Sequence, residues 1–162
     1  MLHVVTHIDD CTVDRLMAVY AESMDDLRDN FADEAEMYEA YRVFLKEFAK
    51  SPRQLILVEV SDDTWVSAMR AIGTANGSWF WEAVETRPDK RGQGYGTDLL
   101  RHTVEHLGSL GMRELTCTIA QSNRISRALH EKCGFAPTDE SPVNCWGELE
   151  EGTVLYRLMD CI

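Results

Sequence analysis

Three glycines alternate with other residues in the stretch from Arg91 to Gly96, which reads Arg-Gly-Gln-Gly-Tyr-Gly. Glycine can take positive φ and lets the backbone come close to a ligand. The stretch lies between an expected strand and an expected helix, and the free amides at the start of that helix would point at an anion. The pattern therefore predicts a phosphate-binding turn.

Two kinds of nucleotide-binding turn do not fit this stretch. The P-loop needs a Lys and a Ser or Thr after its last glycine, whereas Gly96 is followed by Thr97 and Asp98. The dinucleotide fingerprint G-x-G-x-x-G, counted from Gly92, would need a glycine at Thr97, and it should open its domain. The pyrophosphate turn of acetyl-CoA, Q/R-x-x-G-x-G/A, is matched from Arg91 to Gly96.

The surroundings of the turn resemble the general N-acetyltransferase (GNAT) superfamily. The segment from Thr86 to Gly92 is similar to the family's V-x-P-x-x-R-G, with Thr86 at the valine position. The segment from Asn123 to Phe135 resembles the second signature, an Asn followed by A-L-Y-E-K-x-G-F. Two signatures in the right order are far more specific than one glycine-rich turn.

The resemblance implies a set of residues that bind acetyl-CoA as co-substrate. Backbone amides of the turn would hold the pyrophosphate, and the strand before it would be splayed from its neighbour. Backbone groups of Val84 and Thr86 would then pair with the pantetheine arm, and the amide near Val84 would face the thioester oxygen. The side chain of Asn123 would contact the same arm, or else only cap a helix. The turn residues are Arg91, Gly92, Gln93, Gly94, Tyr95 and Gly96.

Transfer to an amine needs a base, and Glu82 is the candidate. An alkyl amine with a pKa near 10.4 is only about one part in 2,500 neutral at pH 7, which corresponds to roughly 4.6 kcal/mol. Glu82 lies four residues before Thr86, and the aromatic residues at 79–81 are expected to raise its pKa. Strand alternation places its side chain on the face of Phe80 and Val84. The alternative is that Glu82 is an ordinary strand carboxylate at a solvent-exposed edge of the sheet.

His130 occupies the position of the family's tyrosine, which usually gives a proton to the departing thiolate. Histidine could act as this acid, or it could simply pack in its helix. His102 and His106 are one helical turn apart, but no third ligand is evident, so no metal site is predicted.

The hydrophobic periodicity predicts a mixed α/β (α+β) domain that spans residues 1–162, in the order β-α-α-β-β-β-α-β-α-β-β. The resemblance implies a mainly antiparallel central sheet of about six or seven strands flanked by about four helices. Thr12 and Ser122 are expected to cap helices, and Asp33 and Glu36 have the spacing of a capping box. The expected strands cover 2–8, 54–60, 64–73, 79–86, 114–120, 135–136 and 153–158, with helices through 13–27, 33–48, 95–107 and 123–132.

Composition limits the partners. The net charge of −12 excludes nucleic acid and anionic membranes as expected partners, because phosphates would be repelled. Neither a signal peptide nor a membrane span is visible, so a cytoplasmic protein is expected. The five cysteines, without a C-x-x-C pair, are expected to be reduced thiols. The sequence leaves the oligomeric state open, a homodimer included.

The sequence thus predicts an enzyme that moves an acetyl group from acetyl-CoA directly to a primary amine. Acidic residues between Asp25 and Glu36 favour a small cationic acceptor, although they also suit solvated helix starts. A protein N-terminus or a lysine is the alternative acceptor. A non-catalytic acetyl-CoA-binding or regulatory module on the same fold is the competing class.

Overall fold

Seven strands form one sheet in the order β1-β2-β3-β4-β5-β7-β6. The computed structural model describes residues 1–159. The strands are β1 (Leu2–Val4), β2 (Gln54–Ser61), β3 (Thr64–Gly73), β4 (Ser78–Thr86), β5 (Glu114–Ala120), β6 (Phe135–Pro137) and β7 (Thr153–Leu158). The helices are α1 (Asp10–Val19), α2 (Ala21–Leu27), α3 (Glu34–Phe48), α4 (Tyr95–Ser109) and α5 (Arg124–Lys132), with short 3-10 turns at Arg28–Asn30 and Pro88–Lys90.

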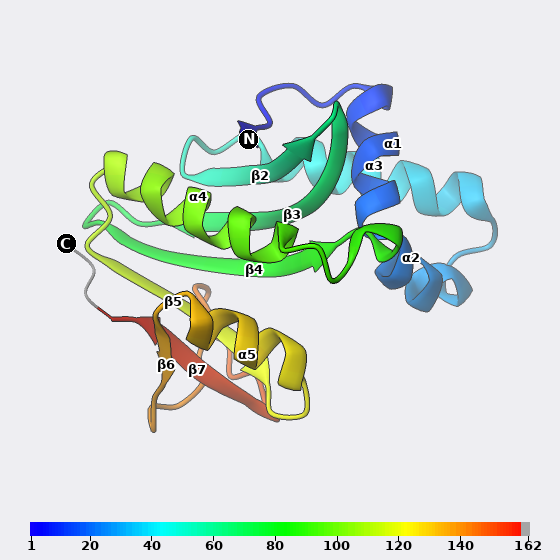
Figure 1. Cartoon of the computed structure of the whole chain (residues 1–162). Coiled ribbons are helices and arrows are strands. Elements are labelled where there is room, and N and C mark those ends of the chain that lie inside the picture. The colour runs from blue at the N-terminus through cyan, green and yellow to red at the C-terminus, as the bar shows by residue number, and fades with distance from the viewer. Residues whose placement is uncertain (160–162) are drawn as a thin grey trace.

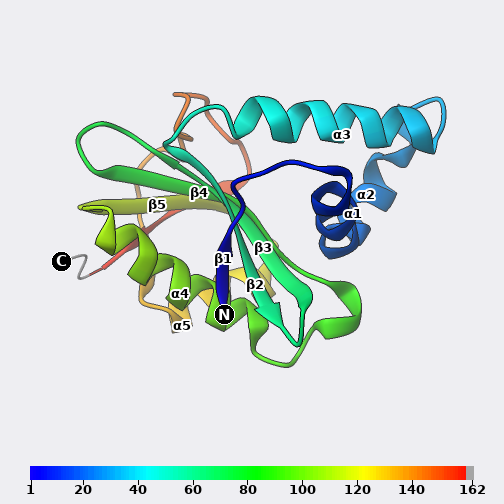
Figure 2. The same cartoon turned by 90° about the horizontal axis from the view of Figure 1, so that it is seen from above.

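The sheet separates two hydrophobic layers. Helices α1 to α3 cover one face and α4 and α5 the other, as Figures 1 and 2 show. Alternation along the strands fills both layers: Ile56 and Val58 of β2 pack with the first three helices, whereas Leu57 between them packs with α4. Except for β4 and β5, all neighbouring strands are antiparallel, so the predicted mainly antiparallel mixed sheet is confirmed.

The parallel strands β4 and β5 separate soon after they begin. Their register pairs Ser78 with Glu114 and ends where Phe80 meets Thr116. Beyond this point the two strands diverge into a V, with α4 on one arm and α5 on the other (Figure 1). The predicted splay of the strand before the glycine-rich turn is therefore present.

A bulge interrupts β4 within the V. Glu82 lies opposite Arg70 of β3, but Glu85 lies opposite Ala68, so β4 has one residue more than β3 in this interval. Ala83 takes the left-handed region, with φ of 54°. The extra residue reverses the alternation that follows, as a β-bulge does.

This bulge corrects one prediction about the site. Val84 packs with α4 on the opposite face from Phe80, so Glu82, Phe80 and Val84 do not share a face. Glu85 instead comes to the side of the first three helices, where it hydrogen-bonds to Ser23.

The helix caps also differ from the expectation. Asp9, not Thr12, caps α1, and Thr12 donates its hydroxyl to a backbone carbonyl. Asn123, not Ser122, caps α5. The first helix is two helices, because the chain turns at Tyr20. The expected cap at Asp33 is confirmed, since its carboxylate accepts from the Glu36 amide.

Candidate active site

The glycine-rich turn leads from β4 into α4 and leaves its backbone open. Gly92 and Gly94 have φ of 76° and 87°, and a Cβ built on either would meet no atom within 4 Å. α4 begins at Tyr95 without a side-chain cap, whereas α1, α3 and α5 each have one. The first amides of α4 therefore remain available to an anion.

Contacts from within the protein hold the turn in place. The Arg91 guanidinium donates to the Thr86 carbonyl at 3.2 Å and pairs with Glu22 of α2 at 2.5 Å. The Tyr95 hydroxyl lies 3.3 Å from that of Ser61. At Gly96 a Cβ would come within 3.3 Å of Leu129 of α5. Glycine at this position thus allows α4 to lie close to α5, while the side chain of Gln93 is exposed.

The bulge in β4 orients one peptide group across the sheet. The Tyr20 hydroxyl donates to the Ala83 carbonyl at 2.7 Å, which directs that carbonyl toward the end of α1. The C=O and the following N–H of a trans peptide point in opposite directions. The Val84 amide therefore points away from Tyr20. In this direction it could donate a hydrogen bond to a carbonyl oxygen held in the V.

Glu82 lies on the face of α1 to α3, in an ion pair. Arg70 donates to its Oε2 from two nitrogens, at 2.6 and 3.2 Å, and lies over the ring of Phe44 at 4.9 Å. The other oxygen, Oε1, is buried and has no hydrogen-bond partner among residues 1–159. Arg70 thus orients the carboxylate and leaves one oxygen to accept a proton or a hydrogen bond.

His130 is enclosed between β4 and α5 and is only 2% exposed. Its Nε2 accepts from the Trp81 indole N–H at 3.1 Å, and its Nδ1 donates to the Ser126 carbonyl at 2.7 Å. These partners fix the neutral tautomer with its single proton on Nδ1. Burial also lowers the pKa of His130 below the usual 6.5. The geometry favours the packing role that the sequence left open.

Asn123 begins α5, and its side-chain oxygen accepts from the Ser126 amide at 3.1 Å. This is the capping role that the sequence offered as the alternative to a contact with pantetheine. The cap uses the amide oxygen, so a contact with a ligand would fall to the amide nitrogen.

The sequence from residue 16 to 135 matches the model of the Acetyltransferase (GNAT) family. The chain belongs to the GNAT acetyltransferase family. The matched region includes the turn, the bulge and His130, so the predicted resemblance is confirmed over most of the chain. No curated protein sequence is similar enough to serve as a relative.

Solved structures of GNAT acetyltransferases share the fold. The PaiA N-acetyltransferase of Thermoplasma acidophilum, in complex with coenzyme A, is 17% identical, with a TM-score of 0.68 over 97% of this chain and 98% of that one. The ribosomal-protein-alanine N-acetyltransferase of Brucella melitensis is 19% identical, with a TM-score of 0.68 over 97% and 98%. The aminoglycoside 6'-acetyltransferase type Ii is 14% identical, with a TM-score of 0.66 over 97% and 95%. At these identities the likeness shows the fold alone.

Sequence reasoning missed several polar groups of this GNAT site. Glu85 borders a cavity of about 330 Å³ beside the bulge, and burial raises its pKa above the usual 4.5. Arg70 and Tyr20 border the same cavity. Arg70 had a visible signal, because it is the one charged residue in the strand from Thr64 to Gly73. The sequence carried no such signal for Glu85, because alternation without a bulge places its side chain on the face of α4 and α5.

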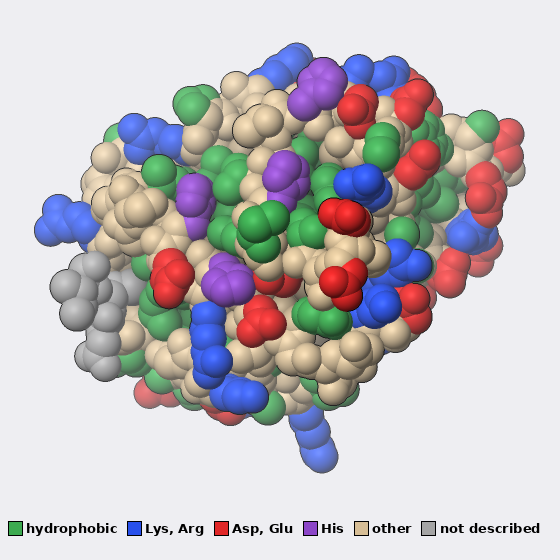
Figure 3. Space-filling model, turned by 45° about the horizontal axis from the view of Figure 1, so that its top comes forward, with side chains coloured by type: hydrophobic (Ala, Val, Ile, Leu, Met, Phe, Trp, Pro, Cys, Tyr) green, Lys and Arg blue, Asp and Glu red, His purple; other side chains and the backbone are tan. Residues whose placement is uncertain are grey.

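The acidic residues near the first helices are largely used locally. Arg28 pairs with both Asp25 and Glu34, and Asp33 caps α3. Glu36 accepts from the Ala32 amide at 2.6 Å. Figure 3 shows acidic side chains interspersed with basic ones at this end of the molecule. These contacts fit the alternative in which the acidic residues serve the helix starts.

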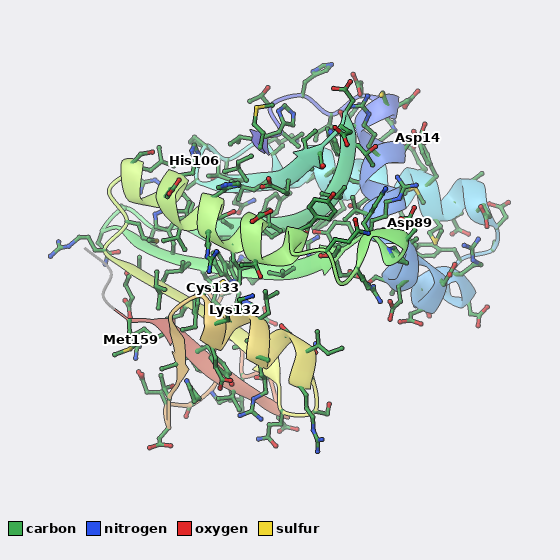
Figure 4. All side chains as sticks on the ribbon, in the orientation of Figure 1. Asp14, Asp89, His106, Lys132, Cys133 and Met159 are labelled. Carbon is green, nitrogen blue, oxygen red and sulfur yellow. The ribbon has the colours of Figure 1, made fainter. Side chains whose placement is uncertain are left out.

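Among residues 1–159 no three metal-ligating side chains come together. His102 pairs with Glu59 at 2.8 Å, while His106 lies near the end of α4, far from Asp89 beside the glycine-rich turn (Figure 4). No helix in the described part of the chain is long and apolar enough to cross a bilayer. The thiols of Cys11, Cys117, Cys133 and Cys145 are free, and Cys161 lies outside the described residues.

Proposed function

We propose that this protein transfers an acetyl group from acetyl-CoA directly to the nitrogen of a primary amine. The observation that carries the proposal is the V between β4 and β5, which opens beside a helix whose first amides have no capping side chain. An extended amide-rich arm can pair with the open edge of β4, and a pyrophosphate can bind at the start of α4.

The residues present fit such a donor. The amides from Arg91 to Gly96 would hold the pyrophosphate, because their backbone is open and a dianion is favoured at a helix N-terminus. Backbone groups of Val84 and Thr86 would pair with the pantetheine arm, and the amide nitrogen of Asn123 would contact it. Bound acetyl-CoA would supply the acetyl group as a thioester.

Glu82 would deprotonate the ammonium ion, directly or through a water. Its Oε1 is the buried carboxylate oxygen that has no partner in the described part of the chain, and Arg70 holds the other oxygen. Removing the proton of an ordinary alkyl ammonium at pH 7 corresponds to roughly 4.6 kcal/mol. The Val84 amide would stabilise charge on the acetyl oxygen, a contribution of about 3 kcal/mol in known enzymes.

His130 would position Trp81 rather than donate a proton. Its only ring proton is already donated to Ser126, and its other nitrogen accepts from Trp81. A proton from the reacting nitrogen can instead reach the departing thiolate, since the two atoms lie side by side during direct transfer. The family's tyrosine is thus replaced by a packed histidine in this chain.

The competing class is a non-catalytic module that binds acetyl-CoA. The enclosed His130 is the observation that favours it, because the usual acid is missing. Both classes predict donor binding, so turnover separates them.

Release of CoA thiol with a broad panel of primary amines tests the proposal. We expect turnover with at least one amine, and we expect Glu82→Gln to lower kcat about 100-fold or more while acetyl-CoA affinity stays the same. Glu114→Gln is the matched control, because Glu114 is a strand carboxylate that pairs with Arg157 away from the site. Tight binding of acetyl-CoA with no turnover for any amine would establish the non-catalytic class.

A further inference from the structure

The cavity beside the β4 bulge has an apolar wall. Its volume of about 330 Å³ lies at the lower end of the range for small-molecule sites, about 300–1,000 Å³. Side chains from the first three helices surround it, and most of them are hydrocarbon or aromatic. The wall includes Tyr20, Met24, Phe31, Met37, Tyr41 and Phe44.

The rim of the cavity is apolar as well. Leu27 of α2 is 46% exposed and Phe44 of α3 is 42% exposed, and both border the cavity. Large apolar side chains left open around a concave site mark a place where a ligand binds. They would contact the part of a ligand that lies farthest from the sheet.

The inner end of the cavity, against β3 and β4, is polar. Ala83 and Glu85 of β4 border it, and so does Arg70, which holds Glu82. Two buried oxygens have no partner among residues 1–159, namely Tyr41 Oη in the cavity lining and Oε1 of Glu82, the carboxylate that pairs with Arg70. Buried polar groups nearly always have one, so a ligand that carries N–H donors would complete this end.

An ammonium group suits this end. The Glu82 carboxylate pairs with Arg70, and the cation that acts on the Glu85 carboxylate is Arg91, which itself pairs with Glu22. A second ammonium, or the hydroxyls of a sugar, would lie against the apolar wall without hydrogen bonds, which is costly.

The geometry points to an acceptor whose single primary amine is joined by a short linker to an aromatic or similarly compact apolar group. The apolar group fills the cavity between α2 and α3, and the nitrogen lies at the bulge beside Glu82. This inference rests on the proposed function and names its substrate class. It narrows the small cationic acceptor that the acidic residues favoured to one with a single ammonium group and an apolar body.

Acetylation of matched amines tests the inference. We expect kcat/KM for 2-phenylethylamine to exceed that for ethylamine, spermidine, glucosamine and a peptide beginning with alanine at least tenfold. Ala40, exposed on α3, borders the cavity, so Ala40→Phe should narrow it without disturbing the core. Ala35→Phe is the control, because Ala35 is exposed on the same helix outside the cavity.

The Ala40→Phe variant should lower kcat/KM for 2-phenylethylamine at least tenfold more than that for ethylamine, whereas Ala35→Phe should change neither. A preference for spermidine, glucosamine or the peptide would overturn the inference and leave the proposed function intact. A second measurement covers the case of no turnover, namely binding of 2-phenylethylamine to the CoA-saturated protein. Binding that Ala40→Phe weakens tenfold supports the inference while the proposed function fails, and no binding overturns the inference.

Discussion

His130 lies where the family resemblance places a tyrosine, and its hydrogen bonds differ from those that a tyrosine could make. The tyrosine that usually stands there has one hydroxyl to donate, whereas both nitrogens of this histidine are occupied by Trp81 and Ser126. The sequence could identify the position through its helix signature. It could not show whether the ring faced the V or the core, because that depends on the Trp81 indole on another element.

The pH dependence of folding tests this packed state. Burial lowers the pKa of His130 in the folded protein, so below its ordinary pKa of 6.5 the unfolded chain takes up a proton that the folded one resists. The free energy of unfolding should therefore fall as the pH falls from 6.5 through the lowered pKa, by at most about 1.4 kcal/mol per pH unit.

Urea unfolding of the parent and of His130→Gln, followed across this pH range, measures the effect. Glutamine can still accept from Trp81 but does not titrate, so its stability should lack this component and the two curves should converge or cross at low pH. Parallel curves would show that His130 titrates normally. If His130→Gln lowers kcat 100-fold or more with unchanged acetyl-CoA affinity, His130 acts as the acid that protonates the thiolate.

At the scale of elements, the bulge in β4 decides which side chains lie on the face that α1 to α3 cover. It brings Glu82 and Glu85 to the same side of the sheet and sends Val84 to the other. Sequence alternation predicted β3 and β5 with the bounds that the structure has, and it located β4 within one residue. It failed inside β4 because nothing marks the bulge: the left-handed residue is Ala83, not a glycine.

Substitutions at Ala83 test the bulge. A β-branched side chain resists φ of 54°, so Ala83→Val should lower the free energy of unfolding by about 1–3 kcal/mol and reduce acetyl transfer at least tenfold. Ala83→Gly should leave the free energy of unfolding within about 1 kcal/mol and the rate of acetyl transfer within about threefold of the parent, because glycine takes this conformation freely. The measurements are urea unfolding and initial rates.

An asparagine at this position separates backbone strain from bulk. Its side chain reaches farther from the backbone than that of valine but tolerates positive φ far better. Ala83→Asn should therefore be more stable than Ala83→Val. If the two variants are equally impaired, crowding of the cavity and not the bulge accounts for the loss.

At the scale of the whole molecule, the sheet separates the helix that begins at the glycine-rich turn from the cavity. Figure 2 shows α4 and α5 on one side of the sheet and α1 to α3 on the other, and the cavity is lined from the side of α1 to α3. We propose that residues 1–162 act as one domain, because both cores share this sheet.

The open glycine-rich turn was predictable from the sequence and the cavity was not. Glycines with positive φ before a helix form a local pattern, so a short motif is enough to locate the turn. The acceptor cavity depends on where α2 ends, how α3 lies against Arg70, and which face Glu85 occupies. Those features come from tertiary packing, and no local pattern encodes them.

Direct transfer requires both substrates to be bound at once. Cys145, the described cysteine that packs against the core under α1 to α3, is a poor candidate for a covalent route, because burial and the Glu82 carboxylate raise its pKa to about 12. A thiol with such a pKa stays protonated at neutral pH and is a poor nucleophile.

The most direct test of direct transfer is a set of initial rates of CoA release. Acetyl-CoA and an accepted amine are varied against each other. Direct transfer predicts double-reciprocal lines that intersect, because both substrates occupy the protein before either product leaves. Parallel lines, together with an acetylated protein isolated in the absence of amine, would show a covalent intermediate and contradict direct transfer at the β4 bulge.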